Sequence, residues 1–101
     1  MIQVEGVYEV AVRVRDLSRA ETFYRDVLGL EVGLRDTKRP WVFLRVGPSG
    51  MIVLQEDPGE WPLQHFAFKV SEATLDRAVD FLAGKEIATE GPVSHDWIPA
   101  R

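Results

Sequence analysis

Two polar side chains stand at matching positions in two similar stretches of the chain. Residues 9–14 read Glu-Val-Ala-Val-Arg-Val, and residues 65–70 read His-Phe-Ala-Phe-Lys-Val. Both stretches alternate strictly, which predicts two strands that each have one apolar face and one mixed face. Glu9 and His65 therefore begin equivalent mixed faces. A carboxylate and an imidazole bind divalent cations and transfer protons, so this pair is the first candidate for chemistry.

Glu9 and His65 also have purely structural interpretations. A histidine on a strand face can be satisfied by a nearby carbonyl or carboxylate. We expect Glu9 to be buried, where an isolated charge is costly, so Arg13 or Lys69 would pair with it. Without a metal, Glu9 and His65 would hydrogen-bond to each other. With a metal that Glu9 does not bind, this carboxylate would serve as a general base.

Aromatic side chains supply candidates for contacts with a small molecule. Trp41, Phe43 and Met51 fall on strands, where they would either line a cavity or form core. Trp97 and His95, near the end of the chain, would form a cavity rim, a dimer contact or a loose tail. The chain has no glycine-rich phosphate loop, and none of its serines has the sequence context of a Ser-His-Asp triad.

The elements that carry Glu9, Trp41, Phe43 and Met51 are predicted to form a β-α-β-β-β unit over about residues 7–57. After the first strand, Asp16 or Ser18 offers an N-cap, and apolar residues at helical spacing predict a helix over 17–28. Gly29 supplies the stop after this helix. Three alternating segments follow as strands, at residues 30–34, 41–46 and 51–55.

Alternation also predicts which side chains share a face in these three strands. The predicted faces are Leu30, Val32 and Leu34; Trp41, Phe43 and Arg45; and Met51, Val53 and Gln55. The apolar stripe of the helix is expected to cover one face of the sheet.

The unit begins again near residue 62. Residues 63–70 are predicted as a strand, Ser71 as an N-cap, and Gly84 as a helix stop that repeats Gly29. The apolar helical stripe is Leu75, Ala78, Val79 and Leu82. The following segment Lys85-Glu86-Ile87 corresponds to Leu30-Glu31-Val32 of the first module and is predicted as a strand. This second module, over about 62–101, is incomplete by comparison with the first. We expect the chain to continue, to be a fragment, or to be covered by a partner at the exposed sheet edge.

Composition places limits on the class of protein. A chain of 101 residues with 46% hydrophobic residues forms one small domain, residues 1–101. The net charge of −4 and the scattered basic residues argue against affinity for nucleic acid or an anionic membrane. The chain has no cysteine, no membrane-spanning apolar run and no signal peptide, so we expect a cytoplasmic protein without thiolate chemistry.

Two motifs resemble the vicinal oxygen chelate superfamily, which includes glyoxalases, fosfomycin-resistance thiol transferases, extradiol dioxygenases and bleomycin-binding proteins. The first is Asp16-Leu17 followed by Phe23-Tyr24-x-x-x-Leu28-Gly29-Leu30, and the second is the His65–Val70 strand. The resemblance implies an α+β fold in which tandem βαβββ modules curl into a half-open barrel, here with the second module incomplete at the C-terminus. It also implies a homodimer.

The resemblance further implies a divalent metal in the cavity, bound by residues of the first and last strands of each module. His65 matches a family ligand, Glu9 falls where histidine is usual, and Gln55 lies near a third position. The metal could be Mn, Fe, Ni or Zn. The family's final Asp-Pro-Asp-Gly turn and its glutamate strand are absent from the sequence. The residues expected to contact a small-molecule substrate are Arg13, Trp41, Phe43, Lys69 and Trp97.

Three functions stay open at this point. The first is a metal-dependent lyase, transferase or dioxygenase whose metal acts as a Lewis acid. The second is a metal-free protein that binds an antibiotic-like small molecule in the same cavity. The third is an interaction module without a ligand. Fold similarity does not choose among them.

Overall fold

The computed structural model describes residues 1–90 of the chain. Its backbone forms two compact units, the first spanning Met1–Gln64 and the second beginning at His65. Each unit is described below by itself.

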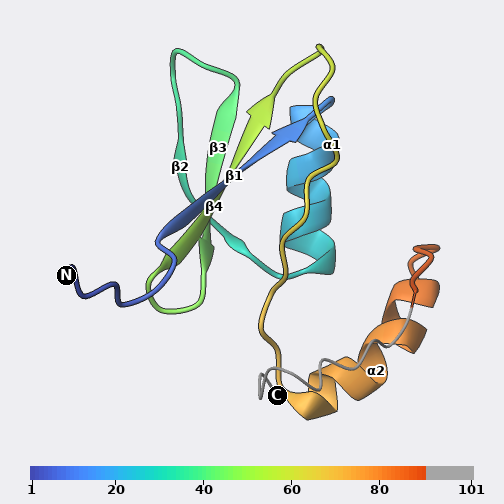
Figure 1. The fold of residues 1–101 in the computed structure, drawn as a ribbon. Coiled ribbons are helices and arrows are strands. Elements are labelled where there is room, and N and C mark those ends of the chain that lie inside the picture. Colours follow the sequence, from blue (N-terminus) through green and yellow to red (C-terminus); the bar gives the residue numbers. More distant parts are fainter. Residues whose placement is uncertain (91–101) are drawn as a thin grey trace. The chain divides into compact units, whose positions relative to one another are not determined.

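The first unit has the element order that the sequence predicts. Strand β1 (Glu9–Val14) is followed by helix α1 (Leu17–Thr22), whose last turns widen into the π-helix η1 (Phe23–Val27). Three strands follow: β2 (Glu31–Arg35), β3 (Trp41–Val46) and β4 (Gly50–Glu56). The predicted β-α-β-β-β module is therefore confirmed (Figure 1).

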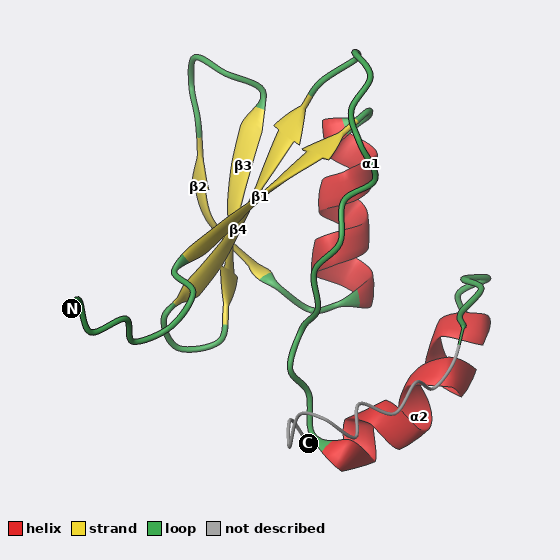
Figure 2. Ribbon diagram, viewed as in Figure 1, coloured by secondary structure: helices red, strands yellow, loops and turns green. Residues whose placement is uncertain are grey.

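The four strands form one mixed, open sheet in the order β1-β4-β3-β2. Strand β1 runs parallel to β4, and the β2–β3 and β3–β4 pairs are antiparallel. Helix α1 packs on one face of this sheet, against β3 and β4 (Figure 2). The core under the helix consists of Val12, Val42, Leu44, Ile52 and Leu54, all less than 9% exposed. The α+β class is confirmed, and the opposite face of the sheet has no helix of this unit over it.

Local capping explains where α1 begins and where η1 ends. Asp16 is the N-cap, because its carboxylate accepts a hydrogen bond from the Arg19 N–H at 3.0 Å. In the π-turn the Leu28 N–H donates to the Phe23 carbonyl, five residues earlier. Gly29 then takes a φ of 71°, a left-handed conformation that glycine adopts without a Cβ clash.

Strand β2 departs from the predicted alternation. Its register against β3 shifts between Val32 and Leu34, so that Gly33 is an extra residue in a bulge. The bulge moves Leu34 onto the face opposite Val32 and turns Arg35 toward the helix side. The prediction that Val32 and Leu34 share a face was wrong, because a bulge breaks the period of two.

The second unit contains helix α2 (Glu72–Ala83), which begins at the predicted N-cap Ser71. Residues 63–70 are not a strand, and Lys85 and Glu86 lie in a turn. Alternation survives locally, since the Phe66 and Phe68 rings meet edge to face with centroids 5.4 Å apart. A strand also needs hydrogen-bonding partners, and within residues 1–90 no strand pairs with this segment. That physical requirement explains why the strand predictions here were wrong.

Candidate ligand-binding site

The open face of the sheet carries the chemistry-bearing side chains of the first unit. Residues that are register partners point to the same face, so the pairing of the strands fixes which side chains meet. Glu9, Met51 and Arg45 form one row across β1, β4 and β3. The next row is Ala11, Val53 and Phe43, and the third is Arg13, Gln55 and Trp41. None of these nine side chains lies on the side of the sheet that α1 covers.

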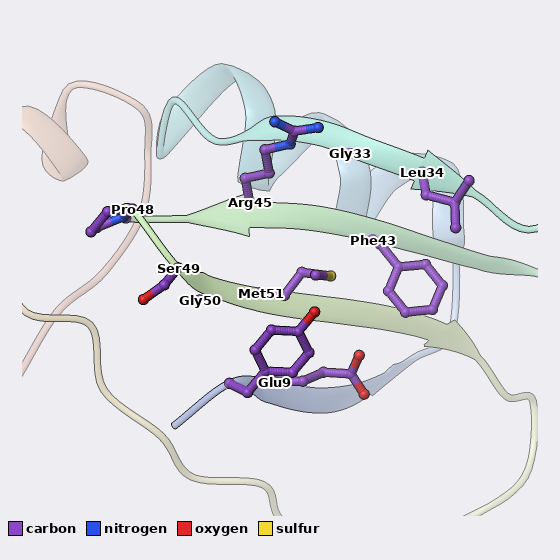
Figure 3. A pocket seen from close by; sticks show the side chains of 11 residues that line it. Glu9, Gly33, Leu34, Phe43, Arg45, Pro48, Ser49, Gly50 and Met51 are labelled. Carbon is purple, nitrogen blue, oxygen red and sulfur yellow. The ribbon is translucent and has the colours of Figure 1, made fainter. Parts of the chain in front are cut away.

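A hollow of about 480 Å³ lies over the first two rows. It extends from the start of β1 across β4 and β3 to the bulge in β2, and the turn between β3 and β4 closes one end. Its lining consists of Tyr8, Glu9, Gly33, Leu34, Phe43, Arg45, Gly47, Pro48, Ser49, Gly50 and Met51 (Figure 3). This volume is in the range of small-molecule sites.

The polar groups of the hollow stand at its two sides, with apolar side chains between them. Figure 3 shows Met51 between Glu9 on β1 and Arg45 on β3. Two strand spacings separate Glu9 from Arg45, roughly 10 Å between Cα atoms. Glu9 is exposed rather than buried, and its carboxylate has no ion-pair or hydrogen-bond partner among residues 1–90. The predicted burial of Glu9 was wrong, because Glu9 begins an edge strand.

The third row lies beyond the hollow, near the loop between β2 and β3. Trp41 is covered by the Arg39 guanidinium, whose carbon lies 3.7 Å from the ring centroid. Arg39 in turn pairs with Asp36 at 2.8 Å. The backbone N–H groups of Lys38 and Arg39 donate to Asp36, and they lower the pKa of its carboxyl group below the usual range. These contacts fix the Trp41 ring at one end of the open face.

Arg13 and Gln55 occupy the same row, but Arg13 is engaged outside it. Its Nε atom lies 3.8 Å from Asp57 Oδ2, so Arg13 pairs with Asp57 and not with Glu9. The Gln64 side chain also bonds the Arg13 backbone at the free edge of β1. Gln64 Oε1 accepts from the Arg13 N–H at 2.6 Å, and Gln64 Nε2 donates to the Arg13 carbonyl at 2.9 Å.

The positions of Glu9 and Gln55 do not support a metal site in which both residues are ligands. Gln55 lies four residues along β4 from the register partner of Glu9, roughly 13 Å further on. Metal–ligand bonds of about 2 to 2.5 Å do not bring both side chains to one ion when they stand perpendicular to the sheet. Within residues 1–90, no three His, Cys, Asp or Glu side chains are grouped so as to hold a metal. His65 belongs to the second unit, so its pairing with Glu9 stays a prediction.

The remaining predicted contacts are distributed as follows. Phe43 lines the hollow, and Trp41 lies beside it with ring centroids 6.5 Å apart. Lys69 is an exposed residue of the second unit, and Trp97 falls outside the described residues, as does His95. The structure therefore brings Glu9 and Phe43 to one hollow and leaves the roles of Lys69 and Trp97 as predictions.

Sequence reasoning did not single out Arg45, Leu34 or Tyr8 as site residues. Arg45 was assigned to the correct face, but nothing nearby in the sequence marked it as different from other exposed arginines. Leu34 reaches the hollow only through the bulge. A glycine inside an alternating segment is a known sign of a bulge, and Gly33 was the signal that could have found it.

Comparisons with known proteins agree with this architecture. A family model described as the Glyoxalase/Bleomycin resistance protein/Dioxygenase superfamily matches residues 6–100. No curated protein matches the chain. A crystal structure of an integron cassette protein from the mobile metagenome of the Halifax Harbour sewage outfall is 41% identical, with a TM-score of 0.86. That match covers 93% of this chain and 82% of the other.

Two further solved structures have enzyme names. Lactoylglutathione lyase from Agrobacterium tumefaciens is 29% identical with a TM-score of 0.74, over 87% of this chain and 75% of that one. A glyoxalase/dioxygenase from Nostoc punctiforme is 24% identical with a TM-score of 0.70, over 90% of this chain and 77% of that one, and it shows the fold alone. From the family match and the βαβββ module, we conclude that this chain belongs to the glyoxalase/bleomycin resistance/dioxygenase superfamily.

Proposed function

We propose that this protein binds a small organic molecule in the hollow on the open face of its sheet. The observation that supports this proposal best is the composition of the hollow. Apolar side chains form its floor, and an unpaired carboxylate and guanidinium stand at its two sides. An apolar surface with a few separated polar groups is typical of small-molecule sites, where the polar groups fix the orientation of the ligand.

The apolar floor and the two charged side chains would contribute to binding in different ways. A ligand body that covers Leu34, Phe43 and Met51 removes apolar surface from water, which stabilises the complex by about 25 cal/mol per Å². Glu9 would accept hydrogen bonds from one end of the ligand, and Arg45 would donate them to the other. The 29% identical structure is named a lactoylglutathione lyase, and this name supports an organic ligand for the present chain as well.

A neutral aromatic probe tests the proposal directly. We expect 2-naphthamide, titrated into the ¹⁵N-labelled full chain, to shift backbone amide signals at residues 33–34, 43–45 and 49–51. Phe43→Ala should weaken binding by about three- to tenfold, because it removes part of the apolar floor. Leu63→Ala is the matched control, since Leu63 is 99% exposed and lies outside the hollow. Shifts confined to other residues, or equal losses in both variants, would contradict the proposal.

A metal-dependent enzyme is the second candidate, favoured by the free Glu9 carboxylate at a family ligand position. Elemental analysis of the purified protein tests it for Mn, Fe, Ni and Zn. Loss of a bound metal in both Glu9→Ala and His65→Ala would support the pair as ligands. Retention of the metal in both variants would place the metal elsewhere, and a protein without metal that still binds the probe would support the first candidate.

A further inference from the structure

We propose that the hollow selects ligands that carry a carboxylate, with Arg45 as the anion-binding side chain and Gly33 as the residue that makes room for it. This inference rests on the proposed function, because it names the chemical class of the molecule that the hollow would bind. It concerns a residue for which the sequence suggested no role.

The first observation is that Arg45 has no carboxylate partner. Four other arginines of the first unit are engaged in ion pairs: Arg13 with Asp57, Arg25 and Arg35 with Glu21, and Arg39 with Asp36. Arg15 donates to the carbonyls of Pro58 and Gly59, and Arg19, which lies outside the hollow, forms no ion pair among the described residues. Arg45 faces Glu31 in the register of β2 and β3, yet no ion pair forms between them among the described residues. Its five N–H donors are therefore available to a ligand in a planar arrangement that matches a carboxylate.

The second observation is the close approach of Arg45 to Gly33. A Cβ atom on residue 33 would lie 3.2 Å from Arg45 Nε, which is tighter than ordinary contact, and 3.4 Å from Arg45 Cγ. The φ of Gly33 is not in the left-handed region, so a Cβ atom at this position would change the space beside Arg45 and would not strain the backbone. Figure 3 shows the Arg45 side chain rising from β3 beside Gly33 of β2. The absence of a side chain at residue 33 thus places the guanidinium at the wall of the hollow.

The third observation is the arrangement of the other groups around Arg45. Met51 lies between Arg45 and Glu9, and Leu34 and Phe43 line the hollow further along β2 and β3. An apolar body would cover these side chains while its anion meets Arg45. Glu9 repels anions, but it stands two strands away, roughly 10 Å, where 0.1 M salt already screens much of the interaction. The net charge of −4 makes the electrostatic potential around the protein negative on average, so a monoanion should bind better than a dianion. The class that results is an apolar organic molecule with one carboxylate.

Three matched probes test the inference on the full chain: 2-naphthoate, its neutral analogue 2-naphthamide, and the cation 2-naphthylmethylammonium. We expect naphthoate to bind about tenfold more tightly than naphthamide, the value of one charge-assisted hydrogen-bond pair that is partly exposed. Arg45→Gln should abolish this preference, because the affinity for naphthoate should fall much more than the affinity for naphthamide. Gly33→Ala should reduce the preference without removing a charge, because the new methyl group displaces the guanidinium. Arg19→Gln, on α1, removes the same charge outside the hollow and should leave the preference intact.

The outcomes separate the inference from the proposed function. Equal binding of naphthoate and naphthamide, a preference that survives Arg45→Gln, or tightest binding of the cation would overturn the inference while leaving small-molecule binding in place. Binding of none of the probes would overturn the proposed function as well. If Arg45→Gln does not fold, as judged by its amide spectrum, Arg45→Lys supplies the same test. Lysine keeps the charge but lacks the planar fork, so the preference should fall by severalfold.

Discussion

Glu21 is a buried charge on the helix side of the first sheet, and two arginines neutralise it. Arg35 donates to it from both terminal guanidinium nitrogens, Nη1 to Oε1 and Nη2 to Oε2, the latter at 2.8 Å. Arg25 Nη1 donates to Oε2 at 3.0 Å. The Arg35 hydrogen bond, opposed by burial and assisted by Arg25, lowers the pKa of the Glu21 carboxyl below its usual value. The sequence offered Asp16 or Ser18 as the N-cap of this helix. Asp16 takes that place, and Glu21, within the helix, forms this ion pair.

We expect Glu21→Gln to destabilise the protein by about 1 to 2 kcal/mol at pH 7, since charge-assisted hydrogen bonds are lost and half-exposed arginines are partly screened by water. A lowered pKa means that the ion pair contributes fully above pH 4.5, the usual value of the group, and that its contribution is lost as the pH falls through the lower folded value. Urea unfolding of both proteins from pH 7 to pH 3 measures this difference. Glu31→Gln is the control, and a difference that grows in acid would contradict the assignment.

At the scale of elements, the two predicted helix stops differ in conformation. Gly29 has a φ of 71°, whereas Gly84 has a φ of −63° and remains right-handed. The positive φ after α2 falls on Glu86 instead, at 60°, within a turn in which the Ile87 N–H donates to the Leu82 carbonyl at 2.9 Å. The sequence treated these glycines as equivalent, and only Gly29 requires a residue without a Cβ atom.

We therefore expect opposite effects from the same substitution at the two glycines. Gly29→Ala should cost about 1 to 2 kcal/mol, because an L-residue is strained at positive φ. Gly84→Ala should be neutral or stabilise by up to about 1 kcal/mol, since its backbone suits alanine and the new Cβ makes ordinary contacts of 3.4 and 3.6 Å. Native-state hydrogen exchange of α1 and α2 reads the two effects separately. Equal losses would show that both ends need a left-handed residue.

At the scale of the whole molecule, unpaired edges and exposed apolar side chains are the features that association could cover. The sheet ends at β1 on one side and β2 on the other, and the Gln64 amide occupies one backbone position of the β1 edge. Large apolar side chains such as Leu63, Phe81 and Val79 are exposed. Neither α1 nor α2, in the described part of the chain, has the length and apolar character needed to cross a bilayer.

From these features and the family match we expect a homodimer, as the sequence already suggested. Sedimentation equilibrium should give a mass of twice 11.4 kDa that falls toward the chain mass on dilution. A single species of the chain mass at the concentrations used for amide spectra would refute the expectation.

Local sequence patterns were sufficient to predict several features of the helices and strands. The N-cap Ser71, the stop at Gly29 and the faces of β3 follow from interactions between residues a few positions apart, so the sequence alone determined them. For the first helix the sequence limited the N-cap to Asp16 or Ser18. Alternation assigned Glu9 to the face of β1 that carries Arg13, and Phe43 to the face of β3 that carries Trp41. Only the pairing of the strands in the order β1-β4-β3-β2 placed these two faces on the same side of the sheet.

Tertiary structure decided the features that depend on which segments lie side by side. The bulge at Gly33 exists only in register against β3, and it sends Leu34 to the hollow and Arg35 to Glu21. The alternating residues 63–70 do not form a strand. Alternation predicts an apolar face and a polar face, but a strand also needs a neighbouring strand for its backbone hydrogen bonds. Whether the Arg45 guanidinium finds a carboxylate partner depends on residues that are distant in the chain. The alternation pattern of a strand does not predict which residues those are.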